Sequence, residues 1–282
     1  MARRYGQARL HTGWRAFHVL AAAALFGVLV PASVSAQASL MTGLGGQAGF
    51  GEGVLEYNDD GSSSQIDISG AFPRGLQYFG QRYTSMYVNN NGTITFGGAT
   101  STYTPARFPV SGNRMIAPFW ADVDTRGGGR PARNGVYWDI QPGQVVVTWH
   151  NVGYYSQSND RENSFQLIIT SNEILDQDDL WRVEFRYARC QWTTGNASGG
   201  QGGLGGTPAQ AGFDAGNGSI YEILPGSGTG GVLGLCSSSN VGVNGIWQFD
   251  IYLGTPQVGS GPEAETSGAV ETTDFSRPQR RR

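Results

Sequence analysis

Two carboxylates near the middle of the chain are the side chains best suited to bind an ion. Asp122 and Asp124 follow the apolar run Met115–Trp120 and are separated by one residue. Side chains two apart on a strand point to one face, so both could offer oxygen ligands to Ca²⁺, which takes about 6–8 oxygens. In the alternative interpretation the two acids end a strand, accept hydrogen bonds from loop amides and pair with Arg126 or Arg114. Calcium loops usually carry more acids at close spacing, and the sequence leaves both interpretations open.

The two cysteines, Cys190 and Cys236, form the next candidate chemical pair. In an oxidising compartment an even pair of cysteines most simply forms one disulfide. The rival interpretation is a catalytic thiolate, which needs a histidine close by. His150 is the only histidine beyond the first 36 residues, so the sequence favours the disulfide.

Isolated acids and tryptophans suggest two carbohydrate-directed alternatives. Asp139, Glu184 and Asp250 could supply the carboxylate pair of a glycoside hydrolase, although the sequence does not bring any two to the required separation. Six tryptophans could form a sugar-stacking platform, but most are expected in the core: Trp120, Trp138, Trp149, Trp181, Trp192 and Trp247. A carbohydrate-binding module is therefore the main alternative function, and a hydrolase is a weaker one.

Other enzyme classes lack their defining residues. The chain contains no lysine, which excludes a Walker phosphate loop, and no serine lies in a G-x-S-x-G elbow. A zinc site would need several histidine or cysteine ligands, and the supply is one histidine and a predicted disulfide. We therefore expect a non-enzymatic protein with no cofactor, calcium being the only candidate ion.

The first 36 residues have the features of a secretory signal. Four arginines precede an apolar stretch from Val19 to Val30, and Val34-Ser35-Ala36 places small residues before a cleavage site at Gln37. The apolar stretch is short for a membrane span, which needs about 20 residues. Cleavage would leave 15 arginines against 22 acids, a net charge of −7. We expect a protein that is secreted, or periplasmic or surface-displayed in a bacterium, and that does not bind nucleic acid.

The elements that would position these side chains are short strands. Period-two patterns and turn residues predict strands at 66–68, 86–89, 93–96, 115–124, 136–140, 144–151, 165–169, 181–187, 209–213, 219–223 and 245–251. Glycine, at 44 of 282 residues, is about twice its ordinary frequency. Many short strands between glycine-rich loops predict an all-β fold, an antiparallel β-sandwich in one domain.

Two local signals are specific. Asn90-Asn91-Gly92 between strands 86–89 and 93–96 predicts a hairpin with a primed turn, because Asn-Gly readily adopts positive φ angles. Pro118 cannot donate to a ladder, so the strand that contains it is expected to lie at an edge or to bulge there. A polar loop is expected at 156–163 and a flexible glycine-rich loop at 195–206.

Composition divides the chain into four parts. After the signal at 1–36 comes a lead-in rich in Gly and Ser at 37–64, expected to pack loosely, and then the β domain at 65–254. From Thr255 to Arg282 the chain turns to Pro, Gly, Glu, Thr and Ser and ends in three arginines. Such a tail has too little apolar surface to fold, so disorder is predicted for 255–282.

Several blocks together resemble a known extracellular module. They are Tyr87–Gly92, Ile116–Asp124, Val147–Tyr155, Phe165–Leu167, Gln191–Gly195, Ala209–Phe213, Leu224–Ser227 and Ser239–Gly242, spread over about two thirds of the chain. In order and number these blocks are similar to the nidogen-type extracellular domain, the NIDO module. The resemblance implies an adhesion module linked to cell–matrix contact, with a matrix protein, cell-surface protein or glycan as partner and no catalysis.

Overall fold

Antiparallel strands make up nearly all of the regular structure in the computed structural model, which describes residues 38–127, 134–175 and 179–257. All of these belong to one unit, Ser35–Arg282. Its helical elements among the described residues are short: α1 (Asn172–Leu175), η1 (Asn196–Ser198) and η2 (Gly230–Cys236). None of the described helices has the length and apolar content to cross a membrane. The predicted signal lies outside the described residues.

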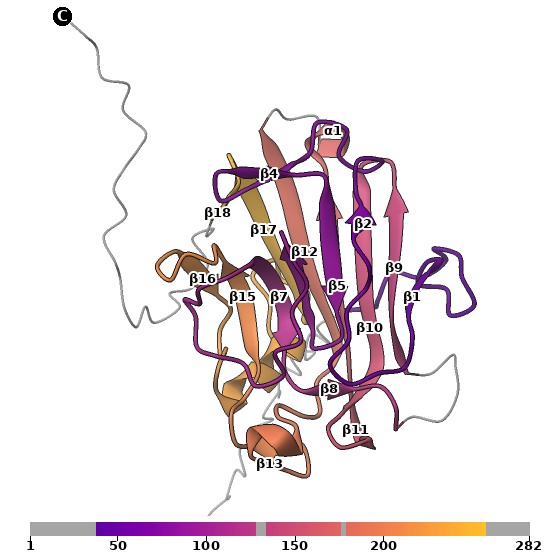
Figure 1. Ribbon diagram of the computed structural model, residues 1–282, viewed down its shortest axis with the longest axis vertical. Helices are drawn as coiled ribbons and strands as arrows, with labels where there is room; N and C mark the ends of the chain where they lie inside the picture. The colour runs from indigo at the N-terminus through magenta and orange to yellow at the C-terminus, as the bar shows by residue number, and fades with distance from the viewer. Residues whose placement is uncertain (1–37, 128–133, 176–178, 258–282) are drawn as a thin grey trace, which may run out of the picture. The chain divides into compact units, whose positions relative to one another are not determined.

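The larger sheet contains eight strands within the described ranges, and each pairs antiparallel with its neighbours. Across the sheet the order is β1 (Gly53–Leu55), β9 (Gly135–Gln141), β10 (Gln144–Tyr154), β11 (Ser158–Thr170), β12 (Leu180–Arg189), β17 (Ile246–Tyr252) and β18 (Thr255–Gln257). The eighth strand, β8 (Val123–Asp124), pairs with the far end of β10. The long central strands β9 to β12 follow one another along the chain and form a meander (Figure 1).

The smaller sheet is built from strands that are more widely separated in sequence. Its order is β16 (Tyr221–Ile223), β15 (Gln210–Asp214), β7 (Arg114–Trp120), β6 (Thr93–Phe96), β5 (Ser85–Asn89) and β2 (Ile66–Asp67). Two separate pairs complete the strands: β3 (Leu76–Tyr78) with β4 (Gln81–Tyr83), and β13 (Gly200–Gln201) with β14 (Leu204–Gly205). The strand β7 lies between β6 and β15 and is therefore an interior strand.

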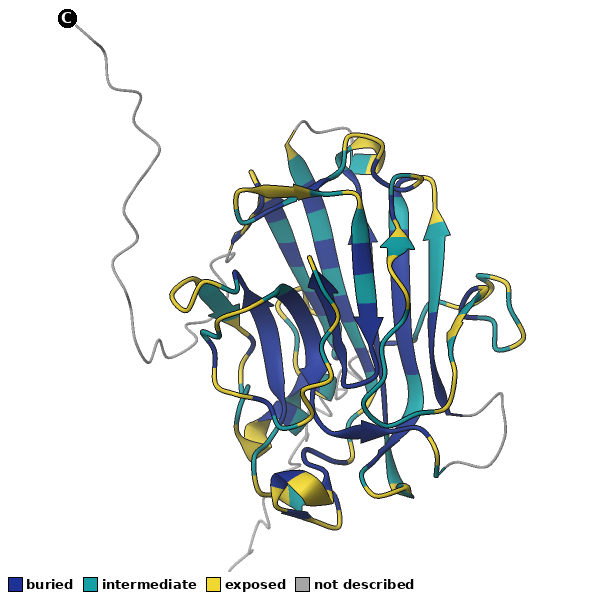
Figure 2. Cartoon of the chain, viewed as in Figure 1, coloured by how far each residue is buried: buried dark blue, intermediate teal, exposed yellow. Residues whose placement is uncertain are grey.

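The two sheets face each other across one hydrophobic core. Strands of both contribute to the same buried cluster, and the burial colouring in Figure 2 shows dark stripes along the paired strands. The ring centroids of Phe119 and Phe165, one from each sheet, are 5.4 Å apart. Those of Phe185 and Phe213 are also 5.4 Å apart. This packing confirms the predicted antiparallel β-sandwich.

The strand β10 is buried on both faces. Val145, Val147 and Trp149 point into the core, while Val146 and Thr148 on the opposite face are also buried. The opposite face is covered by the chain between Ala38 and Phe50, which lies outside the sheets.

The segment before β2 is bound to this face, and the prediction of a loosely packed lead-in at 37–64 is wrong. The side chain of Gln166 accepts a hydrogen bond from the Met41 N–H (2.9 Å) and donates one to its carbonyl (3.0 Å). The ring of Phe50 lies 4.7 Å from that of His150. Within the same segment β1 pairs with β9. A segment with few apolar residues can pack here, because the outer face of the sheet supplies most of the apolar surface in the contact.

The hairpin of β5 and β6 is confirmed, but its turn differs from the prediction. Asn89 pairs with Thr93, leaving a loop of three residues. Only Gly92 has a positive φ in this loop, at 76°. A three-residue loop that closes on one left-handed glycine replaces the expected two-residue primed turn.

Gly92 is required at this position for a second reason. A Cβ added there would lie 1.8 Å from the Phe119 carbonyl oxygen. In the same contact the Phe119 N–H donates to the Gly92 carbonyl (3.2 Å). The backbone of the turn therefore rests directly on the backbone of β7.

Pro118 lies at a bulge, one of its two predicted positions. In the pairing of β7 with β15, Gln210 lies opposite Trp120 and Gly212 opposite Ala117, so the register shifts across Pro118 and Phe119. The bulge lets a residue without an N–H occupy an interior strand. The apolar run ends at Trp120, and the predicted strand 115–124 is divided into β7 and β8.

Three further boundaries differ from the prediction. The expected polar loop at 156–163 is mostly strand, because β11 begins at Ser158, and Ser158 and Asn163 pair with β10. The glycine-rich loop at 195–206 contains η1 and the β13–β14 pair. Residues 255–257 of the predicted tail form β18, and the rest of the tail lies outside the described residues.

The disulfide between Cys190 and Cys236 is present. It connects the residue after β12 to the last residue of η2, across a separation of 46 residues. Val232 and Leu235 of η2 are buried against the core, and the Trp247 indole donates to the Leu235 carbonyl (3.1 Å). The bond therefore holds a segment without sheet pairing against the larger sheet.

The first prediction concerns this bond. Replacing both Cys190 and Cys236 with serine should lower the free energy of unfolding by about 2–4 kcal/mol, because the reduced unfolded chain gains conformational freedom. Urea unfolding followed by tryptophan fluorescence measures the change. Wild-type protein in reducing agent is the control and should lose a similar amount. An unchanged urea midpoint would contradict the stabilising role.

The second prediction separates backbone contact from backbone conformation. Gly92→Ala should cost at least 2–3 kcal/mol more than Gly80→Ala, on the order of an overpacked core substitution, because both glycines have positive φ but only Gly92 abuts another backbone. Gly80 has no neighbouring atom within 4 Å of an added Cβ. Urea unfolding of both variants provides the comparison. Equal decreases in the free energy of unfolding would contradict the prediction, because the backbone at Phe119 would then move aside at little cost.

Candidate functional site

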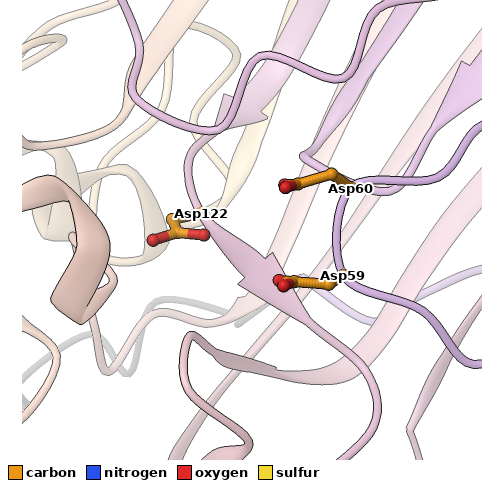
Figure 3. A group of neighbouring side chains, drawn as sticks. All are labelled: Asp59, Asp60 and Asp122. Atoms are coloured by element: carbon orange, nitrogen blue, oxygen red, sulfur yellow. The ribbon is translucent and has the colours of Figure 1, made fainter.

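Three carboxylates from two distant parts of the sequence meet at one corner of the sandwich. Asp59 and Asp60 lie in the connection from β1 to β2, and Asp122 lies between β7 and β8. One oxygen of each carboxylate lies within 4.8 Å of the others (Figure 3). We call Asp59, Asp60 and Asp122 the acidic cluster.

The loop that carries Asp59 and Asp60 is fixed on both sides. Asn58 exchanges hydrogen bonds with Thr125: its N–H donates to the Thr125 hydroxyl (3.0 Å), and its carbonyl accepts from the Thr125 N–H (3.0 Å). The Asn58 side chain then accepts from the Gly61 N–H (2.7 Å). Asn and Asp side chains commonly stabilise turns in this way. The two acids are thereby held in a short, well-bonded turn.

The hairpin loop of β5 and β6 joins that turn to Asp122. The Asn90 side-chain amide donates to the carbonyls of Asp59 and of Val123. Asn91 donates to the Asp60 carboxylate (2.9 Å) and accepts from the Val123 N–H (3.0 Å). Both asparagines are buried, so these amides act as braces between the two acidic segments.

Asp122 itself is packed against a glycine. Its side chain is almost fully buried, with 2% of the residue exposed. A Cβ at Gly195 would lie 2.3 Å from Asp122 Oδ2, so only glycine leaves room for the carboxylate there. The Asp122 carbonyl accepts from the Tyr155 N–H (3.1 Å). The chain around Tyr155 and the chain around Gly195 thus both pack against this acid.

Asp124 has a different environment from Asp122. Its Oδ1 accepts from the backbone N–H (3.0 Å) and Nε (2.9 Å) of Arg126, and its Oδ2 accepts from Arg126 Nη2 (2.7 Å) and the Gln157 N–H (2.8 Å). Burial alone would raise the pKa of Asp124, but the hydrogen bonds from Arg126 and Gln157 outweigh it and hold the pKa below its usual value. This carboxylate is ionised and fully partnered.

The pKa values of Asp122 and Asp59 are shifted in the opposite direction. Burial raises the pKa of Asp122 to about 7, and the charges of Asp59 and Asp60 add to the effect. Burial likewise raises the pKa of Asp59 to about 6, with Asp124 and Asp60 contributing and Arg126 opposing. Arg126 bonds to Asp59 Oδ2 at 2.9 Å. One arginine therefore faces several carboxylates, and repulsion among them remains.

The structure separates the two residues predicted to share an ion. Asp122 lies in the connection between β7 and β8, so the period-two rule of a continuous strand does not apply to the pair. Asp124 forms an ion pair with Arg126, as expected if the acid only ends a strand. Asp122 instead lies beside Asp59 and Asp60. Arg114 bonds instead to the Tyr83 hydroxyl (3.1 Å) and the Phe79 carbonyl (3.4 Å).

Asp59 and Asp60 were missed as site residues in the sequence because they lie in a Gly- and Ser-rich stretch. The only local signal is the turn sequence Asn58-Asp59-Asp60-Gly61, which places adjacent acids in a tight turn. Their meeting with Asp122 depends on pairing between segments about sixty residues apart in the chain, which no local pattern encodes.

Two of the carbohydrate-directed candidates, Glu184 and Asp250, are diagonal neighbours on the paired strands β12 and β17, but each carboxylate is bound by an arginine and Asp139 lies apart from them. Asp250 pairs with Arg182 (2.6 Å) and Glu184 with Arg186 (2.5 Å) on β12 and β17. Asp139 lies on β9, three strands from β12 and about 14 Å away at the usual strand spacing. The six named tryptophans are buried or packed against the core: Trp120, Trp138, Trp149, Trp181, Trp192 and Trp247. The thiolate interpretation also fails, because both cysteines are in the disulfide.

These features define a disulfide-linked all-β module whose polar corner is assembled from loops. The nidogen-like domain model matches residues 84–141 and 138–252, which span both sheets. The chain belongs to the nidogen-like (NIDO) domain family. The resemblance of the sequence blocks to this family is thus confirmed.

Named relatives cover a similar part of this chain. Human (Homo sapiens) alpha-tectorin is 35% identical over 222 residues, which is 68% of this chain and 10% of the tectorin. Nidogen of Drosophila melanogaster is 30% identical over 199 residues, 62% of this chain and 14% of nidogen. Nidogen-1 of Mus musculus is 26% identical over 258 residues, which is 76% of this chain and 19% of nidogen-1. The chain therefore spans a fifth or less of these relatives, and no solved structure matches it significantly.

The third prediction tests the repulsion within the cluster. The pKa of Asp122 is raised from 3.8 to about 7 in the folded state. Ionisation of Asp122 therefore lowers the free energy of unfolding: the full loss is present above pH 7, and no loss is present below pH 3.8. Asp122→Asn should therefore be more stable than wild type by about 1–3 kcal/mol at pH 8 in a chelating buffer. The advantage should shrink as the pH falls to 5. Urea unfolding at the two pH values measures it.

Asp124→Asn is the matched control, because it removes the same charge two residues away. That variant should lose about 1–3 kcal/mol at pH 8, since Arg126 then lacks its ionised partner. Equal effects of the two substitutions would contradict the assignment of repulsion to Asp122 and attraction to Asp124.

Proposed function

We propose that this protein is a secreted, non-enzymatic adhesion module that binds an extracellular matrix or cell-surface protein. The observation that carries the proposal is the family match, which extends over strands of both sheets and over the part of the polar corner that contains Asn90, Asn91 and Asp122. The relatives named above include nidogens and tectorins. Export is supported by the N-terminal signal pattern and is consistent with the disulfide.

The scaffold suits recognition by its loops. The two sheets and the disulfide hold the loops on a rigid core, and binding residues commonly occupy loops positioned in this way. The predicted mature chain carries a net charge of −7, from 15 arginines and 22 acids, which opposes binding to phosphate backbones. A protein surface is therefore favoured over nucleic acid.

The main alternative, a carbohydrate-binding module, has weaker support. Sugar stacking needs exposed aromatic faces, and the six tryptophans named above lie in or against the core. Among the described residues the exposed aromatics are tyrosines: Tyr57, Tyr103 and Tyr252. They come from three separate places in the chain: Tyr57 after β1, Tyr103 after β6 and Tyr252 at the end of β17.

The fourth prediction distinguishes the two. The purified secreted chain, immobilised on a surface, should bind components of matrix and cell-surface extracts saturably. Trypsin treatment of the extract should abolish binding, whereas enzymatic removal of glycans should leave at least half of it. Chain reduced and unfolded before immobilisation is the control and should retain nothing. Binding that survives trypsin but is lost on deglycosylation, together with signals on a glycan array, would replace adhesion to protein with lectin activity.

A further inference from the structure

The acidic cluster contains more negative charge than its protein neighbours compensate. Asp59, Asp60 and Asp122 each direct one oxygen to a common point, with all three oxygens within 4.8 Å of one another (Figure 3). The nearby cation is Arg126, and it already binds Asp124 at 2.7 Å and Asp59 at 2.9 Å. Among the described residues, neither Asp60 nor Asp122 forms an ion pair.

A second, independent observation is that buried acceptors at this corner lack donors. Asp122 is 2% exposed, and its Oδ2 has no hydrogen-bond partner in the described part of the chain. The backbone N–H of Ala197 lowers the pKa of the Asp122 carboxyl, but burial and the neighbouring acids outweigh this effect. Asp59 Oδ1 is also buried without a partner. Native structures rarely leave such groups unsatisfied unless an ion or water completes them.

Asn90 adds a third unsatisfied acceptor. The residue is fully buried, and its Nδ2 donates to the carbonyls of Asp59 and Val123, which fixes the amide orientation. Exchanging the two amide atoms would set an oxygen against two carbonyl oxygens. Its Oδ1 is therefore the atom left without a partner. The unsatisfied atoms of Asp59, Asn90 and Asp122 are all oxygens. A cation can bind such oxygens, whereas a further carboxylate would repel them.

We propose that Asp59, Asp60 and Asp122 together bind one calcium ion. Ca²⁺ prefers oxygen ligands at about 2.3–2.6 Å, so two oxygens on one ion lie no more than about 5 Å apart. The separations in the cluster satisfy this limit. Asp59 and Asp60 are half-buried, which leaves room for water to complete the usual coordination.

Other divalent ions fit the ligand set less well. Zn²⁺ in proteins is bound mainly by cysteine and histidine, and the cluster offers neither. Mg²⁺ demands near-ideal octahedral geometry at about 2.0–2.1 Å and keeps several of its waters.

Arg126 is a positioning residue, because it holds Asp59 while it occupies both oxygens of Asp124. The ion would join the turn at Asp59 to the connection at Asp122, independently of any adhesion partner.

The fifth prediction is a direct binding measurement on the full secreted chain. Protein freed of metal with a chelator is titrated with CaCl₂ in a calorimeter. One ion per chain should bind with a Kd of about 10⁻⁴–10⁻³ M, the range of extracellular modules. At 10 mM CaCl₂ the Tm should rise by roughly 2–6 °C, because the ion binds only the folded state. MgCl₂ should bind at least tenfold more weakly.

Two variants and one control connect the binding to the cluster. Asp122→Asn and Asp60→Asn should each weaken calcium binding at least tenfold and remove the rise in Tm. Their melting in chelator shows that they are folded. Glu173→Gln removes the same charge from an exposed position on α1 and should bind as wild type does. Absence of saturable binding by wild type up to 10 mM, or wild-type affinity in Asp122→Asn, would overturn the proposal. Neither result depends on the adhesion assay.

Discussion

The contact between two backbones, at Gly92 and Phe119, is the constraint on which this corner of the structure depends. The absence of a Cβ at Gly92 lets the hairpin loop lie on the bulge of β7. From there Asn90 and Asn91 reach the segment around Val123. The Trp149 indole, from the opposite sheet, donates to the Asn89 and Asn90 carbonyls at 3.3 and 3.1 Å. One small residue therefore sets how the two sheets meet at this end.

That same arrangement concentrates negative charge. The amides that brace the corner bind backbone groups and one carboxylate, so they fix the positions of Asp59, Asp60 and Asp122 without neutralising them. Arg126 satisfies Asp124 completely and Asp59 in part. Folding thus works against electrostatic repulsion at one place while it is supported by the hydrophobic core elsewhere. Sites where local preference and global fold disagree in this way are where binding functions are commonly found.

Local patterns in the sequence predicted much of the fold. The hairpin of β5 and β6 follows from the strand patterns on either side of Asn-Gly, and the bulge follows from the missing N–H of Pro118. What could not be predicted depends on long-range pairing. Ala38–Phe50 packs because the sheet has an apolar outer face, which the segment's own composition does not reveal. Asp122 was identified as a candidate site residue, but its partners were not, since Asp59 and Asp60 lie about sixty residues away in the chain and only the fold brings them close to it.

The short outer strands have a consequence for how the protein behaves when many copies are close together. The larger sheet ends in β1 and β18, three residues each, and the smaller in β16 and β2, three and two residues. Pro256 in β18 further reduces the number of free N–H groups at that edge. Long unpaired edges invite strand exchange between molecules and fibril growth. A protein with such short edges can be crowded on a surface and still remain a set of separate folded units.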